Sequence, residues 1–442
     1  MIHKIYMVLV LLVADMLTSC DKYEYKIPTD TPIIIEPEEP GESGPPNIKI
    51  GVFWPPVFDM ATDAQFKALA DGNVDVLQYV IPYSQAQNLT LLDKAKANNI
   101  KVSIYDARVY GSDAEITDMV EVYKNHTGLE GYYIKDEPNM AQLDEVATIY
   151  QKLVARDLAH APHVNLFPSL AVGGLLGDID YEADYVRAWI SKVGADKLQY
   201  LSVDIYPFLA DGSFRDLYYN DLDVIRKVAL ELGDIKTSAY LQSVGIEGAY
   251  RRPNEAELRY NMYSMLAYGI KYPVWFTYGT PDPASSGSEV FTSAILDLNG
   301  NKTDLYVPFQ KLNAEVKALG LKLIEMQSQA VYHTGTTIPA GTEALPGWYF
   351  LQLVNPAEEC LIAQLKNWHE GDGRNYAMIV NKSLTETKAI TFTVAGWITD
   401  IGEISKASGS ENPTVIDVAG DGSKTITLIL KPGEGRLFGF KP

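Results

Sequence analysis

The sequence predicts an α/β protein: a (β/α)8 barrel of the TIM type followed by a small C-terminal antiparallel β-sandwich. From residue 48 to about residue 330, short apolar runs alternate with amphipathic stretches of helical periodicity, as in a parallel sheet built from βα repeats. Beyond that point the helical periodicity stops. Short alternating runs, separated by turns such as Asp372-Gly373 and Asp421-Gly422, replace it and are typical of a sandwich.

Residues 1–20 predict an export signal rather than a membrane span. A basic start at His3 and Lys4 precedes an apolar run over residues 5–13, which is too short to cross a bilayer. Small residues directly before Cys20 resemble the lipobox of bacterial lipoproteins, in which the cysteine is lipid-modified and becomes the new N-terminus. The alternative is a leader removed by ordinary signal peptidase. We expect an exported lipoprotein, anchored by this lipid alone in the outer membrane or at the cell surface of a Gram-negative bacterium.

Residues 21–47 are rich in Pro, Glu and Thr and predict an extended linker to the first domain. The barrel is expected over residues 48–330. Its strands are predicted at residues 48–54, 74–81, 101–105, 132–135, 164–167, 200–205, 236–242 and 272–277. The helices between them are expected to begin near Thr62, Leu91, Ala114, Ala141, Tyr181, Leu217 and Asn254, and a last helix is predicted over residues 307–325.

Local signals support this barrel. Thr62 and Asn254 stand directly before apolar periodicity, where a side chain can cap a helix. A doubly wound open sheet is the alternative arrangement. It is disfavoured because Trp54-Pro55-Pro56 follows the first strand, where such a fold needs a Gly-rich phosphate loop.

The second domain is expected over residues 331–442 as a β-sandwich. Its strands are predicted at residues 348–354, 375–380, 388–394, 398–405, 425–430 and 435–440. Trp348, Trp368 and Trp397 belong to this domain. We expect them to pack in its core, the alternative being an exposed platform for carbohydrate.

Composition and missing motifs exclude several functions. The formal net charge of −20, from 37 basic and 57 acidic residues, argues against a nucleic-acid partner, which needs clustered Lys and Arg. The six histidines show no ligand spacing such as His-Glu-x-x-His, so neither a metal nor an organic cofactor is expected. The sequence has no Gly-x-Ser-x-Gly elbow, which argues against an α/β-hydrolase esterase.

Two neighbouring carboxylates mark the predicted fourth strand. The strand over residues 132–135 ends in Asp136 and Glu137 and is stopped by Pro138. Like charges this close raise each other's pKa unless one is hydrogen-bonded or paired, so such a pair at the tip of an apolar strand suggests a use. Catalytic residues of barrels sit at the C-terminal ends of strands. The sequence therefore predicts an active site at this tip.

Polar side chains also stand at the tips of other predicted strands, and strand parity turns several of them inward. We expect them to meet at one mouth, with these candidates: Trp54, Arg108, Asp136, Glu137, Asn165, Asp204, Tyr206, Gln242 and Tyr278. Carboxylates, amides and aromatic rings without a Cys/His cluster suit the binding and cleavage of carbohydrate. Glycosidases use two carboxylates that flank the scissile bond, one of which protonates the leaving oxygen.

The layout resembles the retaining glycoside hydrolase superfamily that includes family 5 and the family 42 β-galactosidase-like enzymes. Asp136-Glu137-Pro138 stands where those enzymes carry Asn-Glu-Pro or a close variant. Further phrases look like family-42-like bacterial lipoproteins: Asp204-Ile205-Tyr206-Pro207, Arg252-Pro253-Asn254-Glu255-Ala256-Glu257-Leu258 and Ala267-Tyr268-Gly269. The resemblance spans roughly residues 48–330.

The resemblance implies residue roles. Glu137 matches the general acid/base, and Asp136 replaces the preceding Asn, which usually contacts the sugar. The nucleophile should be a Glu at the tip of strand seven, where this sequence has Gln242, and a neutral amide cannot form the glycosyl ester. Asp204 is the best substitute for the second carboxylate, and Glu247 is a weaker candidate.

The expected function is a glycoside hydrolase that cleaves O-glycosidic bonds of a polysaccharide or oligosaccharide, with Glu137 as proton donor and Asp204 as second carboxylate. The other candidates are substrate-binding residues. The alternative is a non-catalytic, cell-surface glycan-binding lipoprotein on a degenerate barrel, and a third possibility is a scaffold with an acidic surface. The separation of the two carboxyls would decide the mechanism: about 5–5.5 Å suggests retention and about 6.5–9.5 Å inversion. Glu137 could instead be a structural ion-pair partner of Lys135 or Arg108.

Overall fold

The computed structural model describes residues 45–233, 235–283, 287, 289–367 and 373–442. Eight parallel strands close into a barrel in sequence order, with the first strand paired to both the second and the eighth. The strands are β1 (Gly51–Phe53), β2 (Val76–Gln78), β3 (Lys101–Ile104), β4 (Leu129–Asp136), β5 (Ala161–Leu166), β6 (Leu201–Asp204), β7 (Thr237–Gln242) and β8 (Tyr272–Phe276). The predicted fold class is confirmed. The predicted export signal with Cys20, most of the linker, and Trp368 lie outside the described residues.

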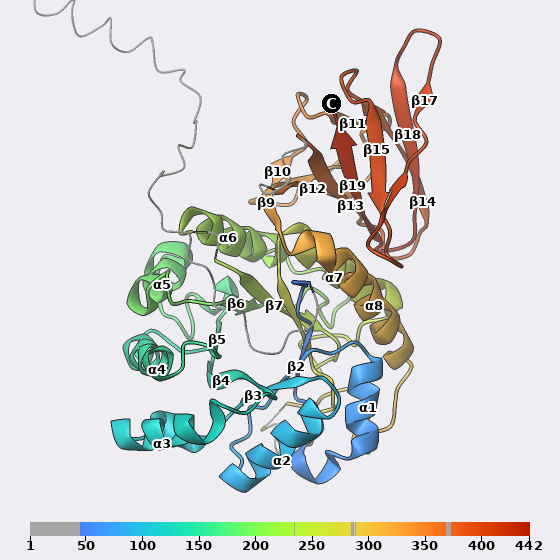
Figure 1. The fold of residues 1–442 in the computed structure, drawn as a ribbon. Coiled ribbons are helices and arrows are strands. Elements are labelled where there is room, and N and C mark those ends of the chain that lie inside the picture. Colours follow the sequence, from blue (N-terminus) through green and yellow to red (C-terminus); the bar gives the residue numbers. More distant parts are fainter. Residues whose placement is uncertain (1–44, 234, 284–286, 288, 368–372) are drawn as a thin grey trace, which may run out of the picture. The chain divides into compact units, whose positions relative to one another are not determined.

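Helices follow the strands and ring the barrel (Figure 1). They are α1 (Asp63–Asp71), α2 (Gln85–Lys96), α3 (Asp113–Tyr123), α4 (Leu143–Arg156), α5 (Arg187–Val193), α6 (Tyr218–Glu231), α7 (Glu255–Ala267) and α8 (Tyr306–Leu323). Both predicted caps are confirmed, since Thr62 accepts from the Gln65 amide and Asn254 forms a capping box with Glu257. The second helix starts earlier than predicted because Ser84 caps it in a box of its own.

Strand β4 carries the irregularity that matters most for the site. Its pairing with β5 aligns Tyr133 with His163 but Lys135 with Val164, so one residue is extra and β4 bulges between these pairs. A β-bulge changes the direction in which the following side chains point. Gly131 permits the close pairing before the bulge, because a Cβ there would lie 1.8 Å from the Ala161 carbonyl oxygen.

The barrel interior is filled mainly by aromatic side chains. Inward-facing residues from β1, β2, β4, β7 and β8 form this inner cluster, together with Tyr206 just beyond β6: Phe53, Val76, Tyr133, Tyr206, Tyr240, Tyr272 and Val274. A larger cluster lies between the strands and the helices, as expected for a barrel whose strands are covered on both faces. The high tyrosine content of the sequence is therefore largely a packing feature.

The C-terminal domain consists of a seven-stranded and a four-stranded sheet whose buried faces share a second core. Their strands are β9 (Met326–His333), β10 (Glu343–Ala344), β11 (Leu351–Leu353), β12 (Cys360–Asn367), β13 (Asn375–Asn381), β14 (Lys388–Val394), β15 (Asp400–Ile404), β16 (Glu411–Pro413), β17 (Asp417–Val418), β18 (Lys424–Leu430) and β19 (Gly435–Lys441). All six predicted strands are present. The prediction missed the short strands β10, β16 and β17, and also β12 and β9. Strand β9 follows α8 almost directly and runs through residue 330.

Two tryptophans of this domain are not in its core. Trp348 is 74% exposed and Trp397 is 49% exposed, so the predicted core packing is wrong for both. Trp348 precedes β11, and Trp397 lies in the connection between β14 and β15. The core is filled instead by shorter side chains on the strands themselves, including Leu351, Phe392 and Ile401.

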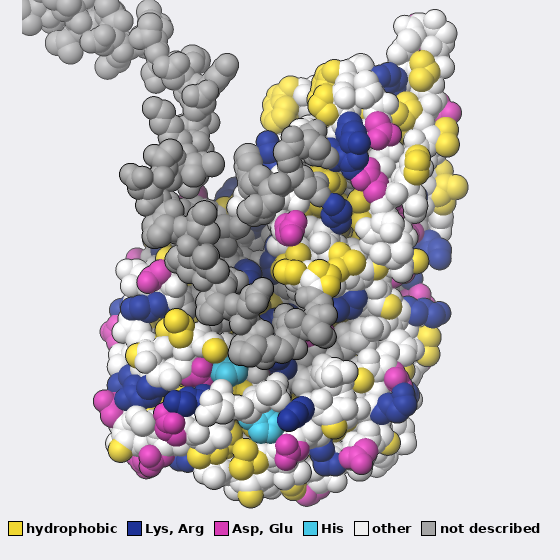
Figure 2. Space-filling model, in the orientation of Figure 1, with side chains coloured by type: hydrophobic (Ala, Val, Ile, Leu, Met, Phe, Trp, Pro, Cys, Tyr) yellow, Lys and Arg dark blue, Asp and Glu magenta, His cyan; other side chains and the backbone are white. Residues whose placement is uncertain are grey.

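The surface mixes charges of both signs. Basic and acidic side chains are interspersed over the visible face of the barrel, in spite of the excess of acidic residues (Figure 2). Among the described residues, no helix has the length and apolar character that crossing a membrane requires.

Candidate active site

A cavity of about 480 Å³ opens at the carboxyl ends of the barrel strands. Its size falls within the range of about 300–1,000 Å³ usual for small-ligand sites. The polar lining comes from Asp136, Glu137, Asn165, Asp204 and Glu289, and the aromatic lining from Phe53, Trp54, Tyr206, Tyr240, Tyr250, Phe276 and Phe291. Strand tips far apart in the sequence therefore meet in one cup. Six of the nine predicted candidates line it: Trp54, Asp136, Glu137, Asn165, Asp204 and Tyr206.

The tip of β4 reaches the cavity in a conformation that side chains rarely adopt. The backbone of Glu137 has a φ of 48°, in the left-handed region that non-glycine residues usually avoid. Its amide donates to the Asn165 carbonyl oxygen at 2.8 Å, which fixes the turn against β5. Strained residues of this kind cluster at functional sites, where the surrounding structure holds them.

Asn165 organises the carboxylates. Its Nδ2 donates to Asp204 Oδ1 at 3.0 Å and to Asp136 Oδ1 at 3.2 Å, and its Oδ1 accepts from the Ser202 hydroxyl at 3.0 Å. The serine hydroxyl therefore fixes which end of the amide points at the two acids. One neutral side chain holds β4 and β6 at a defined separation.

Glu137 and Asp204 both line the cavity, and each carboxyl disfavours the ionised form of the other. Burial raises the pKa of Glu137 most, and the nearby carboxylates of Asp204, Asp136 and Glu289 raise it further. Burial also raises the pKa of Asp204, and Asp136 adds to this, while Asn165 and Tyr206 oppose it through hydrogen bonds. Both pKa values are raised, so the pair retains a proton to higher pH than isolated carboxyls would.

Asp136 has a different environment. Its side chain is exposed, yet protein surrounds it closely, because the surface that it exposes faces the cavity rather than bulk solvent. Burial raises its pKa, and the hydrogen bond from Asn165 opposes that shift. An acid placed this way can accept hydrogen bonds from a polar ligand.

Aromatic rings form the walls of the cup. Tyr206 stacks on Phe276 with ring centroids 4.8 Å apart, and Tyr250 meets Tyr206 edge-on at 5.4 Å. Trp54 follows β1 with a φ of 56°, so its large side chain is also held on a strained backbone. The prediction named Trp54 and Tyr206 but missed Phe276, which the alternation along β8 could have shown.

The loops after β7 and β8 are joined into one wall. Ile246 bridges to both Tyr250 and Phe291, and the Thr292 hydroxyl accepts from the Gly245 amide at 2.8 Å. Gly245 has to be a glycine, because a Cβ would lie 2.6 Å from the Arg252 amide nitrogen. Nothing in the sequence pattern signals that these two loops pair, so Tyr250, Phe291 and Glu289 escaped prediction.

Gln242, at the tip of β7, has a structural role in place of the expected contact with substrate. Its Oε1 accepts from the Phe208 amide at 2.9 Å, and its Nε2 donates to the carbonyl oxygens of Phe208 at 3.1 Å and Arg251 at 2.9 Å. The side chain is buried and does not line the cavity. It ties the loop after β6 to the loop after β7.

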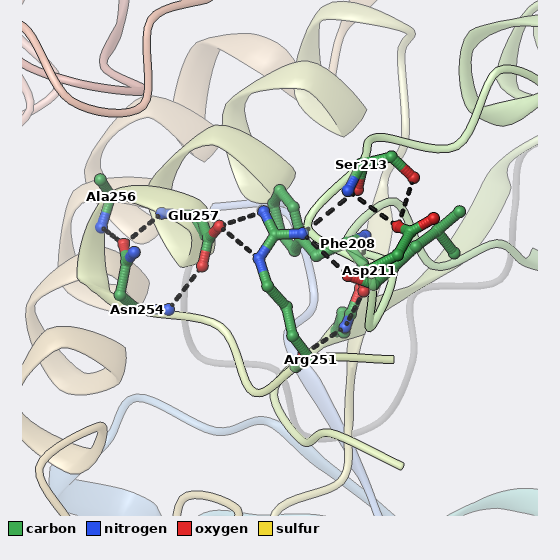
Figure 3. A network of polar contacts seen from close by, with 9 residues as sticks. Phe208, Asp211, Ser213, Arg251, Asn254, Ala256 and Glu257 are labelled. Carbon is green, nitrogen blue, oxygen red and sulfur yellow. Dashed lines mark hydrogen bonds and ion pairs between the residues drawn. The ribbon is translucent and has the colours of Figure 1, made fainter. Parts of the chain in front are cut away.

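Arg251 continues this link (Figure 3). Its guanidinium forms an ion pair with Glu257 at the start of α7 and donates to the carbonyl oxygens of Leu209 and Ser213, each at 3.2 Å. It also lies over the Phe208 ring, 5.0 Å from the centroid. The two loops that carry Tyr206 and Tyr250 are therefore fixed from behind.

Three further candidates lie elsewhere. Arg108 forms a two-point ion pair with Asp106, at 3.0 and 2.7 Å. Burial alone would raise the pKa of Asp106, but the hydrogen bonds from Arg108 outweigh it and lower the pKa. Tyr278 is fully buried against Phe309, so the predicted role of these residues in substrate binding does not fit their positions. Glu247 is exposed and is not among the residues that line the cavity.

The structure also bears on two other roles that the acids could have, as ion-pair partners or as metal ligands. Among the ion pairs of the described residues, Glu137 forms none with Lys135 or Arg108. Within the described part of the chain, no group of three or more His, Cys, Asp or Glu side chains could hold a metal ion. The arrangement can donate a proton from one acid while a second, ionised acid lies beside it.

No family model and no curated protein matches the chain. Among solved structures, a β-galactosidase from Bacillus circulans sp. alkalophilus has a TM-score of 0.59 at 9% identity, over 89% of this chain and 99% of that one. A GH27 β-L-arabinopyranosidase from Geobacillus stearothermophilus has a TM-score of 0.48 at 11% identity, over 90% and 97%. A glucosidase from Croceicoccus marinus has 0.45 at 11%, over 91% and 98%. The first of these likenesses shows that this chain has a fold also found in glycoside hydrolases.

Proposed function

We propose that this protein is a glycoside hydrolase that cleaves O-glycosidic bonds of a polysaccharide or oligosaccharide. The observation that carries the proposal is that two acids from different strands, Glu137 and Asp204, line one aromatic cup at the carboxyl ends of the barrel strands. The fold shared with a known β-galactosidase supports it. The sequence resemblance to families 5 and 42 points to the same chemistry.

The two acids take different roles in this proposal. Glu137 holds its proton at neutral pH, because burial and three neighbouring acids raise its pKa, so it protonates the leaving oxygen. Asp204 ionises first and attacks the anomeric carbon, forming a glycosyl ester. Water then hydrolyses the ester, and Glu137 acts as the base in that step.

The closeness of the pair supports retention of configuration. Inverting enzymes keep their carboxyls about 6.5–9.5 Å apart to hold a water molecule between them and the sugar, whereas retaining enzymes keep them about 5–5.5 Å apart. Asn165 donates both to Asp204 and to Asp136, the residue before Glu137, and so holds the tips of β4 and β6 near each other, which favours the shorter separation. The second carboxylate thus comes from β6, and Gln242 on β7 is not required to act as the nucleophile.

The test is the release of new reducing ends from a panel of plant and microbial polysaccharides. The wild type should release sugar from at least one of them, and Glu137→Gln should lower the rate about 10²–10⁴-fold, the usual contribution of a general acid. Glu247→Gln is the matched control, because this glutamate is exposed and outside the cavity. It should leave the rate unchanged.

Two outcomes would contradict the proposal. Binding without release in the wild type and in Glu137→Gln alike would support the alternative of a non-catalytic glycan-binding protein. Release that Glu137→Gln leaves unchanged would show that another group supplies the proton.

We also propose that the protein is an exported lipoprotein whose only membrane attachment is a lipid on Cys20. The sequence of residues 1–20 supports this proposal. Labelling of expressing cells with a fatty-acid analogue should mark the wild type and spare Cys20→Ala. Equal labelling of the two proteins, or none in either, would contradict the anchor without affecting the proposed reaction.

A further inference from the structure

The charged side chains among the described residues that line the cup are all acidic. Four acidic side chains line it: Asp136 and Glu137 from the tip of β4, Asp204 from β6, and Glu289 from the loop after β8. Among the described residues, no Lys, Arg or His side chain belongs to the lining. An anionic ligand would therefore meet four acidic side chains and, among the described lining residues, no basic side chain.

Two arginines near the cup contact other partners, and Lys135, which precedes Asp136, does not line the cup but opposes, through its charge, the rise in pKa that burial causes in that acid. Arg215 lies behind the wall, 5.5 Å from the centroid of the Tyr250 ring, and its Nε donates to the Tyr206 carbonyl oxygen at 3.0 Å. Arg251 is held by Glu257 and backbone carbonyls. Both guanidiniums stabilise the loops and do not enter the cup.

The aromatic walls of the cup can pack against the apolar faces of a sugar ring. The stacked pair of Tyr206 and Phe276 and the ring of Trp54 offer apolar surface, while the ionised acids accept hydrogen bonds from hydroxyl or ammonium groups. A pyranose has both kinds of surface. A carboxylate or sulfate on the ring, in contrast, would be repelled in a site where solvent screening is weak.

We propose that the cup selects its sugar by charge: it accepts an uncharged glycone or one with a protonated amine, and it excludes uronic acids and sulfated sugars. This selectivity rests on the proposed function, because it describes the sugar at the same acids. Glu289 is then a specificity-determining residue, since it is an acidic side chain of the lining that comes from the loop after β8 and has no proposed part in the chemical steps.

The test compares matched methyl glycosides in the gluco, galacto and manno series, each as the neutral sugar, the 6-carboxylate and the 2-amino sugar. Calorimetry or ligand-observed NMR at neutral pH measures their dissociation constants. In the series that binds, the uronate should bind at least about tenfold more weakly than the neutral sugar, because its charge is uncompensated. The amino sugar should bind at least as well as the neutral one.

Glu289→Gln provides the second measurement. The variant should reduce the ratio of the dissociation constant of the uronate to that of the neutral sugar, while it still releases reducing ends. A residue with a merely structural role would not change that ratio. If the uronate binds as well as the neutral sugar while neutral glycans are hydrolysed, the charge selection is wrong and the proposed function stands. If no sugar in any series binds and no glycan is cleaved, both are overturned.

Discussion

The tips of β4 and β7 differ in how they use their polar atoms, although glycosidases of the resembled superfamily place an acid at each. At β4, Asp136 and Glu137 face a cavity on a bulged strand, and Glu137 has a strained backbone. At β7, Gln242 is buried and uses its amide to bind the backbone of two loops. The acids at the tip of β4 face the cavity, whereas the amide at the tip of β7 is hydrogen-bonded to the backbone of two loops.

This difference shows that position on a barrel does not by itself assign a role. A neutral amide at β7 looks like a lost nucleophile when only the sequence is read. The contacts of Gln242 show a connection between loops, and Asp204 on β6 lies beside Glu137 instead. Substitutions at the strand tips test whether the two tips differ in role as their contacts indicate.

The largest expected effect is that of Asp204→Ala on turnover. Without this carboxylate no glycosyl ester forms, so release of reducing ends should fall at least as far as in Glu137→Gln, by about 10²–10⁴-fold or more. Added formate should restore part of the rate, because a small carboxylate can fill the space left by the side chain. Asp204→Ala with the rate of the wild type would remove Asp204 from the mechanism.

Next in size is Gln242→Glu, the change that would restore the residue expected from the resemblance. A carboxylate oxygen would face the carbonyl oxygens of Phe208 and Arg251, so we expect a loss of about 1–3 kcal/mol in the free energy of unfolding and no gain in activity. Urea unfolding and reducing-end assays measure the two effects. The exposed Gln85→Glu is the control and should change stability by less than about 0.5 kcal/mol. A more active, equally stable Gln242→Glu would overturn the structural role.

A smaller effect is expected on the pH dependence of the melting temperature in Glu137→Gln. Folding raises the pKa of Glu137, mainly by burial, so the native state is increasingly disfavoured as pH rises above the unfolded value of about 4.3. Glutamine does not ionise, so the variant does not lose stability in this way as pH rises. The variant should melt about 2–4 °C higher than the wild type near pH 8, and this difference should shrink towards pH 4. A difference in melting temperature that does not depend on pH would contradict the raised pKa of Glu137.

The smallest expected effect is that of Tyr278→Phe. The hydroxyl is buried and has no hydrogen-bond partner among the described residues, and the ring lies outside the cavity lining. Its removal should change the free energy of unfolding by less than about 0.5 kcal/mol and leave turnover unchanged. A large loss of turnover would show that Tyr278 touches substrate after all.

The parts of the site that the sequence predicts are those set by local rules. Strand parity correctly turned Asp204 and Tyr206 inward, and the caps at Thr62 and Asn254 were recognised from side-chain type alone. Pro138 and the paired acids marked the end of β4. These features depend on a few neighbouring residues, and the sequence shows them directly.

What escaped prediction depends on contacts between distant segments. The bulge in β4 arises from pairing with β5, and the wall of Tyr250 and Phe291 arises from two loops that bridge at Ile246. The tie made by Gln242 joins residues 34 positions apart. Exposed aromatic residues such as Trp348 were assigned to the core because composition alone favours that assignment.

The most direct test of the central claim is the anomeric configuration of the first sugar released from a cleaved glycan, followed by proton NMR before mutarotation. The proposed roles of Glu137 as acid/base and Asp204 as nucleophile predict that the product keeps the configuration of the substrate. A product of inverted configuration would contradict the account, because inversion proceeds without a glycosyl ester on Asp204.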